Sequence, residues 1–201
     1  MNRVELKKEA RNSLKGNYLI TITTTLLYII CIIIGVILYI NVPILRLILS
    51  VIIISSLSFG FFNTFLKIAR GEEISVSNLW EKSNMGIKYF GLQFIITLFT
   101  RLWTLLLIIP GFIAHYSYQF SYYIMLDDPD IGIMDAISLS KELTYGHKME
   151  LFILTLSFIP WYIIGAFTFG LLYLYVIPYH LTTICNFYNK ITNEYLEETI
   201  D

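Results

Sequence analysis

Long apolar runs alternate with short polar segments along this chain. A bilayer core of about 30 Å needs about 20 apolar residues in helical form, and six runs approach or exceed that length. The pattern predicts an all-α fold, a polytopic transmembrane helical bundle of about six spans arranged as three hairpins with interfacial cytoplasmic helices. The predicted spans are about 18–40, 44–66, 89–109, 112–126, 149–168 and 171–188. The fourth run is short and closely follows Pro110-Gly111, so five spans, or four plus a re-entrant hairpin, remain alternatives.

The polar segments between these runs predict helices that lie along the membrane surface. In residues 1–16, Leu6, Ala10 and Leu14 fall on one side of a helix whose other sides are basic. Residues 133–143 repeat this amphipathic pattern, and helices of this kind lie in the headgroup plane. Residues 1–201 are therefore expected to form a single membrane domain that begins with an amphipathic helix.

Lysine and arginine residues are concentrated at one set of span ends. Twelve of them flank the ends that share a side with the N-terminus, whereas only Arg46 flanks the opposite ends, where the predicted turns at 41–43, 109–111 and 169–170 are very short. Because cytoplasmic loops carry the excess of basic residues, the sequence predicts a multi-pass protein of the cell (plasma) membrane with cytoplasmic N- and C-termini.

Composition agrees with a membrane protein and excludes several other classes. Apolar residues make up 56% of the chain and charged residues 14%, against about 25% charged in soluble domains. A net charge of −1 argues against nucleic acid as a partner. Cys31 and Cys185 lie inside apolar runs, so we expect neither a disulfide framework nor a cysteine metal site. No metal and no cofactor is expected.

Three glycines recur at the inner ends of the predicted hairpins. Gly16, Gly86 and Gly146 each follow a short polar segment and precede a span, at spacings of 70 and 60 residues. We interpret them as helix-turn glycines that end an interfacial helix and direct the chain into the bilayer. Three units of this kind would be an internal repeat. The alternative is chance, because glycine is common at helix ends.

Four side chains form a candidate intramembrane polar site: Arg101, His115, Tyr118 and His180. Ionisable groups within a membrane are costly, so each is a functional hypothesis. The alternatives are that Arg101 extends to the outer interface and that the two histidines are hydrogen-bonded packing residues. No Asp or Glu lies within the six spans, which argues against a carrier coupled to protons or cations.

The acidic residues gather instead on the predicted cytoplasmic side, at Asp127, Asp128, Asp130 and Asp135. Carboxylate oxygens suit a divalent cation. The interpretation we favour is that the Asp-Pro-Asp sequence ends one helix and begins the next.

The second half of the chain carries a set of motifs that resembles a known family. These segments are Pro110-Gly111-Phe112, Tyr122-Tyr123, Asp127-Asp128-Pro129, Ser140-Lys141, Gly146-His147-Lys148, Trp161 and Ile177-Pro178-Tyr179. With Leu14-Lys15-Gly16-Asn17 and Arg70-Gly71 upstream, they resemble the bacterial integral membrane family catalogued as domain of unknown function 975. His115 and Pro160 depart from that family's pattern, and a proline at position 160 is expected to kink the fifth span.

The resemblance implies little about activity, because that family has no assigned function. That family is also distantly similar to the membrane domain of glycerophosphodiester phosphodiesterases, and this similarity implies a connection with lipids. We therefore expect a non-enzymatic accessory or scaffold component linked to envelope or lipid processes. Its expected partners are membrane lipids and either another membrane protein or further copies of itself. The alternative is a small transporter or channel for an amphiphile or anion that uses Arg101.

Overall fold

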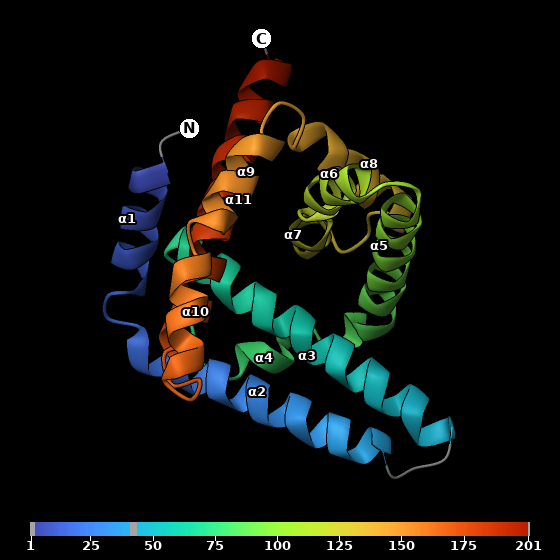
Figure 1. The fold of residues 1–201 in the computed structure, drawn as a ribbon, viewed down its shortest axis with the longest axis vertical. Coiled ribbons are helices and arrows are strands. Elements are labelled where there is room, and N and C mark those ends of the chain that lie inside the picture. Colours follow the sequence, from blue (N-terminus) through green and yellow to red (C-terminus); the bar gives the residue numbers. More distant parts are fainter. Residues whose placement is uncertain (1–2, 41–43, 201) are drawn as a thin grey trace.

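The computed structural model describes the backbone of residues 3–40 and 44–200, and this part of the chain contains helices and no strands (Figure 1). The all-α prediction is therefore confirmed for these residues. The helices are α1 (Arg3–Leu14), α2 (Tyr18–Ile40), α3 (Ile44–Arg70), α4 (Asn78–Glu81), α5 (Gly86–Leu106), α6 (Ile108–Tyr118), α7 (Ser121–Asp127), α8 (Ile133–Leu143), α9 (Lys148–Leu156), α10 (Ile159–Phe167) and α11 (Tyr173–Ile200), with a 3-10 turn at Ser83–Met85. The predicted turn at 41–43 lies outside the described residues, as does the side chain of Arg46.

Three helical stretches are long and apolar enough to span a membrane: Tyr18–Gly35, Ser83–Leu106 and Lys148–Phe167. A bundle of six spans is therefore not confirmed. The predicted span at 112–126 is divided between α6 and α7, which have 11 and 7 residues. Neither reaches the length of about 20 residues that a bilayer core requires.

A side chain from another helix stabilises the break between α6 and α7. Ser140 of α8 is completely buried, and its hydroxyl donates to the carbonyl of Ser117 (2.8 Å) and accepts from the N–H of Phe120 (3.2 Å). Backbone groups released by a helix break need such partners when they are buried. Ser140, one of the family-like positions, thus completes the hydrogen bonding of this interruption.

The fifth predicted span is also interrupted, between α9 and α10. Pro160 occupies the first turn of α10, where its missing N–H costs no helical hydrogen bond. The chain turns at Ser157 and Phe158, whose N–H groups bond to carbonyls three or four residues back. In place of the kink expected from Pro160, the helix is interrupted at Ser157 and Phe158, within a stretch that as a whole is long enough to span a membrane.

The helices pack in a cyclic order. Each short polar helix contacts the preceding hairpin: α4 packs on α3, α8 packs on α7, and α1 packs on α11 from the opposite end of the chain. The long helices follow the same order, since α3 packs on α5, α6 on α9, and α11 on α2. Contacts between distant parts of the sequence, such as α1 with α11, close the arrangement (Figure 1).

The contact between α3 and α4 requires glycine at position 60. A Cβ atom there would overlap the carbonyl oxygen of Leu79, so no larger residue fits without moving α4. Polar side chains also hold α4 in place: Lys67 forms an ion pair with Glu81 (2.8 Å), and Asn78 donates to the same carboxylate (2.5 Å). These hydrogen bonds lower the pKa of Glu81, with Lys67 as the main cause.

The apolar side of α1 is covered by protein. Leu6, Ala10 and Leu14 are buried, as the pattern predicts, but α1 packs on α11 and α3. Lys7 lies over the ring of Phe158 (4.3 Å to the centroid), and Arg11 lies 5.9 Å from that of Tyr179. The expectation that this helix inserts its apolar side among lipid headgroups is therefore replaced by docking onto the protein.

Large apolar side chains cover much of the outer surface. Leu19 of α2 is 80% exposed, Leu105 of α5 86% and Phe167 of α10 82%, and many of their neighbours are similarly open. Soluble proteins rarely expose apolar surface of this extent. These three side chains lie on the three stretches that are long enough to span a membrane.

Candidate functional site

Arg70 is the last residue of α3, and the local sequence fixes that helix end. Gly71 follows with left-handed backbone (φ 72°). The N–H of Gly71 donates to the carbonyl of Ile68, and the N–H of Glu72 donates to the carbonyl of Lys67. This pair of bonds is a Schellman motif, which favours glycine at the left-handed position. The motif leaves the Arg70 side chain at the negative end of the helix dipole, where a cation is stabilised.

Asp127 is the last residue of α7, where a carboxylate is electrostatically unfavourable unless a cation is near. The helix ends here because Asp128 precedes Pro129, and a residue before proline is held in extended backbone. Asp128 then accepts the N–H of Asp130 (3.0 Å). The acidic segment therefore ends a helix, as its sequence indicates, and it also brings Asp127 to the end of α3.

Arg70 and Asp127 form a two-pronged ion pair. The Nη1–Oδ1 distance is 2.7 Å and the Nη2–Oδ2 distance is 2.8 Å, with both side chains about one-third exposed. Paired parallel hydrogen bonds are the strongest geometry available to arginine and a carboxylate. The hydrogen bonds to Asp127 raise the pKa of Arg70 above its ordinary value.

Two residues of α11 complete the network. Tyr188 donates its hydroxyl to Oδ2 of Asp127 (2.7 Å), and the side-chain oxygen of Asn189 accepts from Nε of Arg70 (3.3 Å). The network thus joins α3, α7 and α11, whose contributing residues are separated by at least 57 positions in the sequence. The sequence pattern did not mark Arg70, Tyr188 or Asn189 as site residues. The one signal available for Arg70 was an arginine at a predicted helix end, directly before a glycine.

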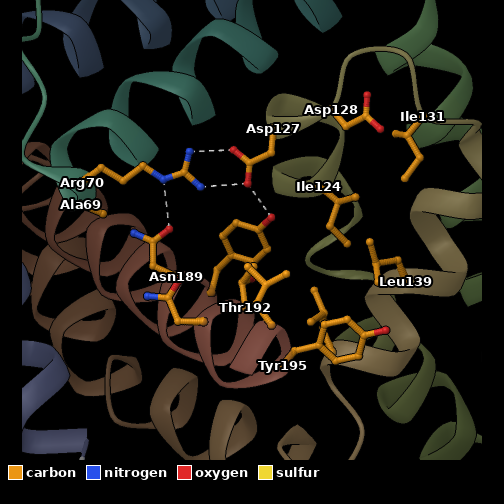
Figure 2. Close-up of a pocket in the computed structure, with 14 residues that line it drawn as sticks. Ala69, Arg70, Ile124, Asp127, Asp128, Ile131, Leu139, Asn189, Thr192 and Tyr195 are labelled. Atoms are coloured by element: carbon orange, nitrogen blue, oxygen red, sulfur yellow. Dashed lines mark hydrogen bonds and ion pairs between the residues drawn. The ribbon is translucent and has the colours of Figure 1, made fainter. Parts of the chain in front are cut away.

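A cavity of about 790 Å³ opens beside this network (Figure 2). Arg70, Asp127 and Asn189 lie toward one end of it, while Ile124, Ile131 and Leu139 lie toward the other. The remaining lining residues are Ala69, Asp128, Leu143, Tyr188, Thr192, Asn193, Tyr195 and Leu196. A cavity of this size falls in the range of small-molecule binding sites. One end carries the Arg70–Asp127 pair, and the other end combines apolar side chains with the Asp128 carboxylate, which lies beside Ile131 (Figure 2).

The ion pair also borders a second, smaller cavity. This one measures about 100 Å³, and its lining includes Asn63, Lys67 and Glu81 together with Arg70 and Asp127. The Arg70–Asp127 pair therefore contributes to the lining of both cavities. The pair thus connects α3 to α7 and also lies between the cavity of about 790 Å³ and the cavity of about 100 Å³.

Arg101 lies on α5 and its side chain is exposed. Its sequence neighbours Leu102 and Trp103 are also exposed, at 50% and 46%. Arg101 does not belong to the lining of either cavity beside Arg70. This position on the outer surface fits the alternative in which its side chain extends along the surface to an interface.

His115 and Tyr118 both lie on α6 but have different surroundings. His115 is exposed and lines a hollow of about 290 Å³ with Thr100, Thr104 and Gly111 in the α5–α6 hairpin. Tyr118 is buried, and the ammonium group of Lys141 lies 5.5 Å from its ring centroid.

His180 belongs to an aromatic cluster formed with residues of the α9–α10 region. Its Nδ1 hydrogen-bonds to the hydroxyl of Tyr162 (2.8 Å), and its ring stacks on Phe158 with centroids 4.5 Å apart. The hollow that His115 lines includes neither His180 nor Arg101. The four candidate residues thus have different partners, and the described contacts do not assemble them into one site.

The three helix-turn glycines fall into two classes. Gly16 (φ 88°) and Gly146 (φ 82°) have left-handed backbone. Their turns contain equivalent hydrogen bonds: the N–H of Asn17 donates to the carbonyl of Leu14, and the N–H of His147 donates to the carbonyl of Thr144. Gly86 has φ −56° and is the first residue of α5. Gly86 thus follows the 3-10 turn Ser83–Met85 and begins the next helix directly, without the left-handed turn found at Gly16 and Gly146.

Within the described part of the chain, no group of three or more His, Cys, Asp or Glu side chains is arranged to hold a metal ion. Asp127 is instead paired with Arg70 and Tyr188, and Asp128 accepts the backbone N–H of Asp130.

Comparison with known proteins gives one match. Residues 104–195 match the family model described as "Protein of unknown function (DUF975)". This region runs from the end of α5 into α11 and contains Asp127, Tyr188 and Asn189, whereas Arg70 lies before it. The match supports the resemblance to the DUF975 family over this part of the chain. No curated protein and no solved structure matches the sequence.

Proposed function

We propose that this chain is a multi-pass protein of the cell membrane, built from three hairpins, with both termini in the cytoplasm. Three apolar helical stretches support membrane insertion. The one-sided distribution of lysine and arginine supports the orientation. In this arrangement the Arg70–Asp127 network lies at the cytoplasmic headgroup level.

An internal repeat of three units is part of this proposal. Its support is the cyclic packing, in which α1, α4 and α8 each contact the hairpin before them. The matching turns at Gly16 and Gly146 add a local likeness between the first and third units. On this interpretation, α3, α7 and α11 are equivalent helices, and each supplies part of the network.

The function that the geometry supports best is that of a non-enzymatic accessory or scaffold component linked to envelope or lipid processes. The observation that carries it is the network at Arg70, which joins one helix from each hairpin beside a cavity of about 790 Å³. Both oxygens of Asp127 are occupied by Arg70 and Tyr188, so this carboxylate is poorly placed to act as a general base. A distant relation to the membrane domain of glycerophosphodiester phosphodiesterases is part of this proposal, and it would connect the protein with lipids.

Affinity purification of the tagged full chain in mild detergent, followed by native mass spectrometry, tests this function. We expect a co-purifying membrane protein, a second copy of the chain, or bound lipid. Recovery of a bare monomer, with neither lipid nor protein, would argue against the proposal. Enzymatic turnover of a lipid substrate by the purified chain would overturn it.

Cysteine accessibility tests the orientation. Asn12→Cys on α1 and Glu197→Cys on α11 place thiols at exposed positions, and Phe169→Cys places one in the turn between α10 and α11. In a Cys31→Ser, Cys185→Ser background, an impermeant maleimide added to intact cells should label only the Phe169→Cys variant. Labelling of Asn12→Cys or Glu197→Cys from outside would contradict the orientation.

The transporter alternative retains one structural argument, namely that the Arg70–Asp127 pair borders two cavities. If the protein is a transporter that uses Arg101 to bind its substrate, Arg101→Ala abolishes flux of an amphiphile or anion in proteoliposomes and leaves expression unchanged. If flux occurs and Arg101→Ala leaves it intact, the route passes elsewhere, and Arg70 becomes the residue to substitute.

A further inference from the structure

The cavity beside Arg70 has an uneven distribution of charge and apolar surface. At one end, Arg70 donates three of its five N–H groups to Asp127 and Asn189. One N–H remains on each Nη atom, and the two point from opposite edges of the guanidinium, so one of them can serve a given ligand group. At the other end, Ile124, Ile131 and Leu139 form an apolar wall (Figure 2). A ligand that fills this space needs an acceptor-rich head and an apolar body.

Asp128 contributes a negative charge to the cavity lining, opposite in sign to that of Arg70. It lines the cavity, and its Oδ1 accepts the N–H of Asp130, while Oδ2 has no partner among the described residues. The lining contains one guanidinium and two carboxylates, Asp127 and Asp128, of which Asp127 is already paired. A headgroup with only negative charge would lie beside the Asp128 carboxylate, and one with only positive charge would lie beside Arg70.

We propose that this cavity binds a phospholipid with a zwitterionic, amine-bearing headgroup. Its phosphate accepts from a remaining Nη N–H of Arg70, its ammonium group faces Asp128, and the start of one acyl chain lies along Ile124, Ile131 and Leu139. The headgroup, the glycerol and the start of one acyl chain suit a cavity of about 790 Å³, and the rest of the lipid extends outside it. The inference rests on the proposed membrane orientation, because that orientation puts Arg70 at the depth of the lipid headgroups.

Native mass spectrometry on the purified full chain tests this assignment. The probes are three lipids with identical dioleoyl chains, mixed in equal amounts: phosphatidylethanolamine, phosphatidylglycerol and a trimethylammonium-propane lipid. We expect the zwitterionic lipid to be retained about tenfold more than either competitor, which corresponds to about 1.4 kcal/mol. Equal retention of the three lipids, or preference for a singly charged one, would overturn the proposal.

Two pairs of variants locate the binding. Asp128→Asn should remove most of the preference for the zwitterionic lipid, whereas Asp130→Asn, in the same loop but outside the lining, should retain it. Leu139→Trp should fill the apolar end and reduce retention of all three lipids, whereas Met134→Trp, at a 51% exposed position of the same helix, should not. Equal effects within either pair would count against the cavity as the site. Monodisperse elution and an unchanged melting temperature show that each variant is folded.

These measurements separate the lipid assignment from the proposed function. Retention is measured on the protein alone, so a failure to find a protein partner does not alter it. Conversely, a co-purified partner together with unselective lipid retention leaves the accessory function standing and removes the lipid assignment.

Discussion

The guanidinium of Arg70 and the carboxylate of Asp127, 57 residues apart in the sequence, meet in a two-pronged ion pair with N–O distances of 2.7 and 2.8 Å. Each residue ends its own helix, and Tyr188 and Asn189 of a third helix bond to the same pair. The pair therefore bridges three elements at the edge of a cavity.

Removing the negative partner of this pair should destabilise the protein moderately. Asp127→Asn loses the ion pair and weakens the bond from Tyr188, and we expect a loss of about 1 kcal/mol because both side chains are one-third exposed and screened by solvent. Thermal unfolding in detergent measures it. The loss should shrink at about 1 M salt, where the Debye length is about 3 Å. Asp130→Asn is the matched control, and an equal loss there would contradict the assignment.

The close approach of α4 to α3 predicts a larger effect at Gly60. Gly60→Ala places a Cβ atom against the backbone oxygen of Leu79, and backbone cannot yield as a flexible side chain does. We expect a destabilisation of about 1–3 kcal/mol, typical of overpacking. Gly91→Ala is the control, because its new Cβ meets only the mobile Cδ1 of Ile133, at 3.0 Å. If the two variants melt at the same temperature, the described contact between α3 and α4 is wrong.

The left-handed turns at Gly16 and Gly146 predict similar losses at two distant positions. A Cβ added at either glycine would have no atom within 4 Å, so alanine meets backbone strain alone, worth about 1 kcal/mol. Asparagine tolerates this conformation better, and Gly16→Asn and Gly146→Asn should therefore cost less than the alanine variants. Chemical or thermal unfolding of the four variants measures this order, and its reversal would contradict the turn geometry.

The Lys67–Glu81 pair predicts a component of acid sensitivity. Because the pKa of Glu81 is lower in the folded protein than in the unfolded chain, its stabilisation is present above the ordinary glutamate range. It is lost as the pH falls through the lowered folded-state value. Glu81→Gln should therefore lower the melting temperature near neutral pH and flatten its dependence between about pH 5 and 3. Glu73→Gln, at an exposed position of the preceding segment, should behave as wild type. An unchanged acid profile in the Glu81 variant would exclude this contribution.

Local patterns in the sequence account for much of the helical layout. The first apolar run predicts 18–40, and α2 has those bounds. The 3–4 spacing of Ala136, Ser140 and Leu143, with Ile133 and Ile137 on the same side, predicts the buried side of α8. These features follow from helical periodicity within one segment, so they require no knowledge of the neighbouring chain.

Interruptions of the apolar runs depend on other elements. Nothing between Ser117 and Ser121 is a helix breaker, yet the helix breaks there, and the hydroxyl of Ser140 from α8 satisfies the released backbone groups. Mean hydropathy over residues 112–126 predicts one span, because an average over the segment does not detect a break in the helix. Likewise, the apolar side of α1, considered alone, predicts contact with lipid headgroups, but α11 covers that side in the fold.

The sequence by itself determined the class of the protein, since a 56% apolar chain with its lysines and arginines at one set of span ends predicts membrane helices and their orientation. It also placed the end of α7 at the Asp-Asp-Pro segment through the backbone preference before proline. Only the tertiary structure decided which polar side chains meet. Arg101 was prominent because its span surrounds it with apolar residues, but it lies exposed on α5. Arg70 was inconspicuous among the flanking cations, and it became the centre of the site because α3, α7 and α11 converge there.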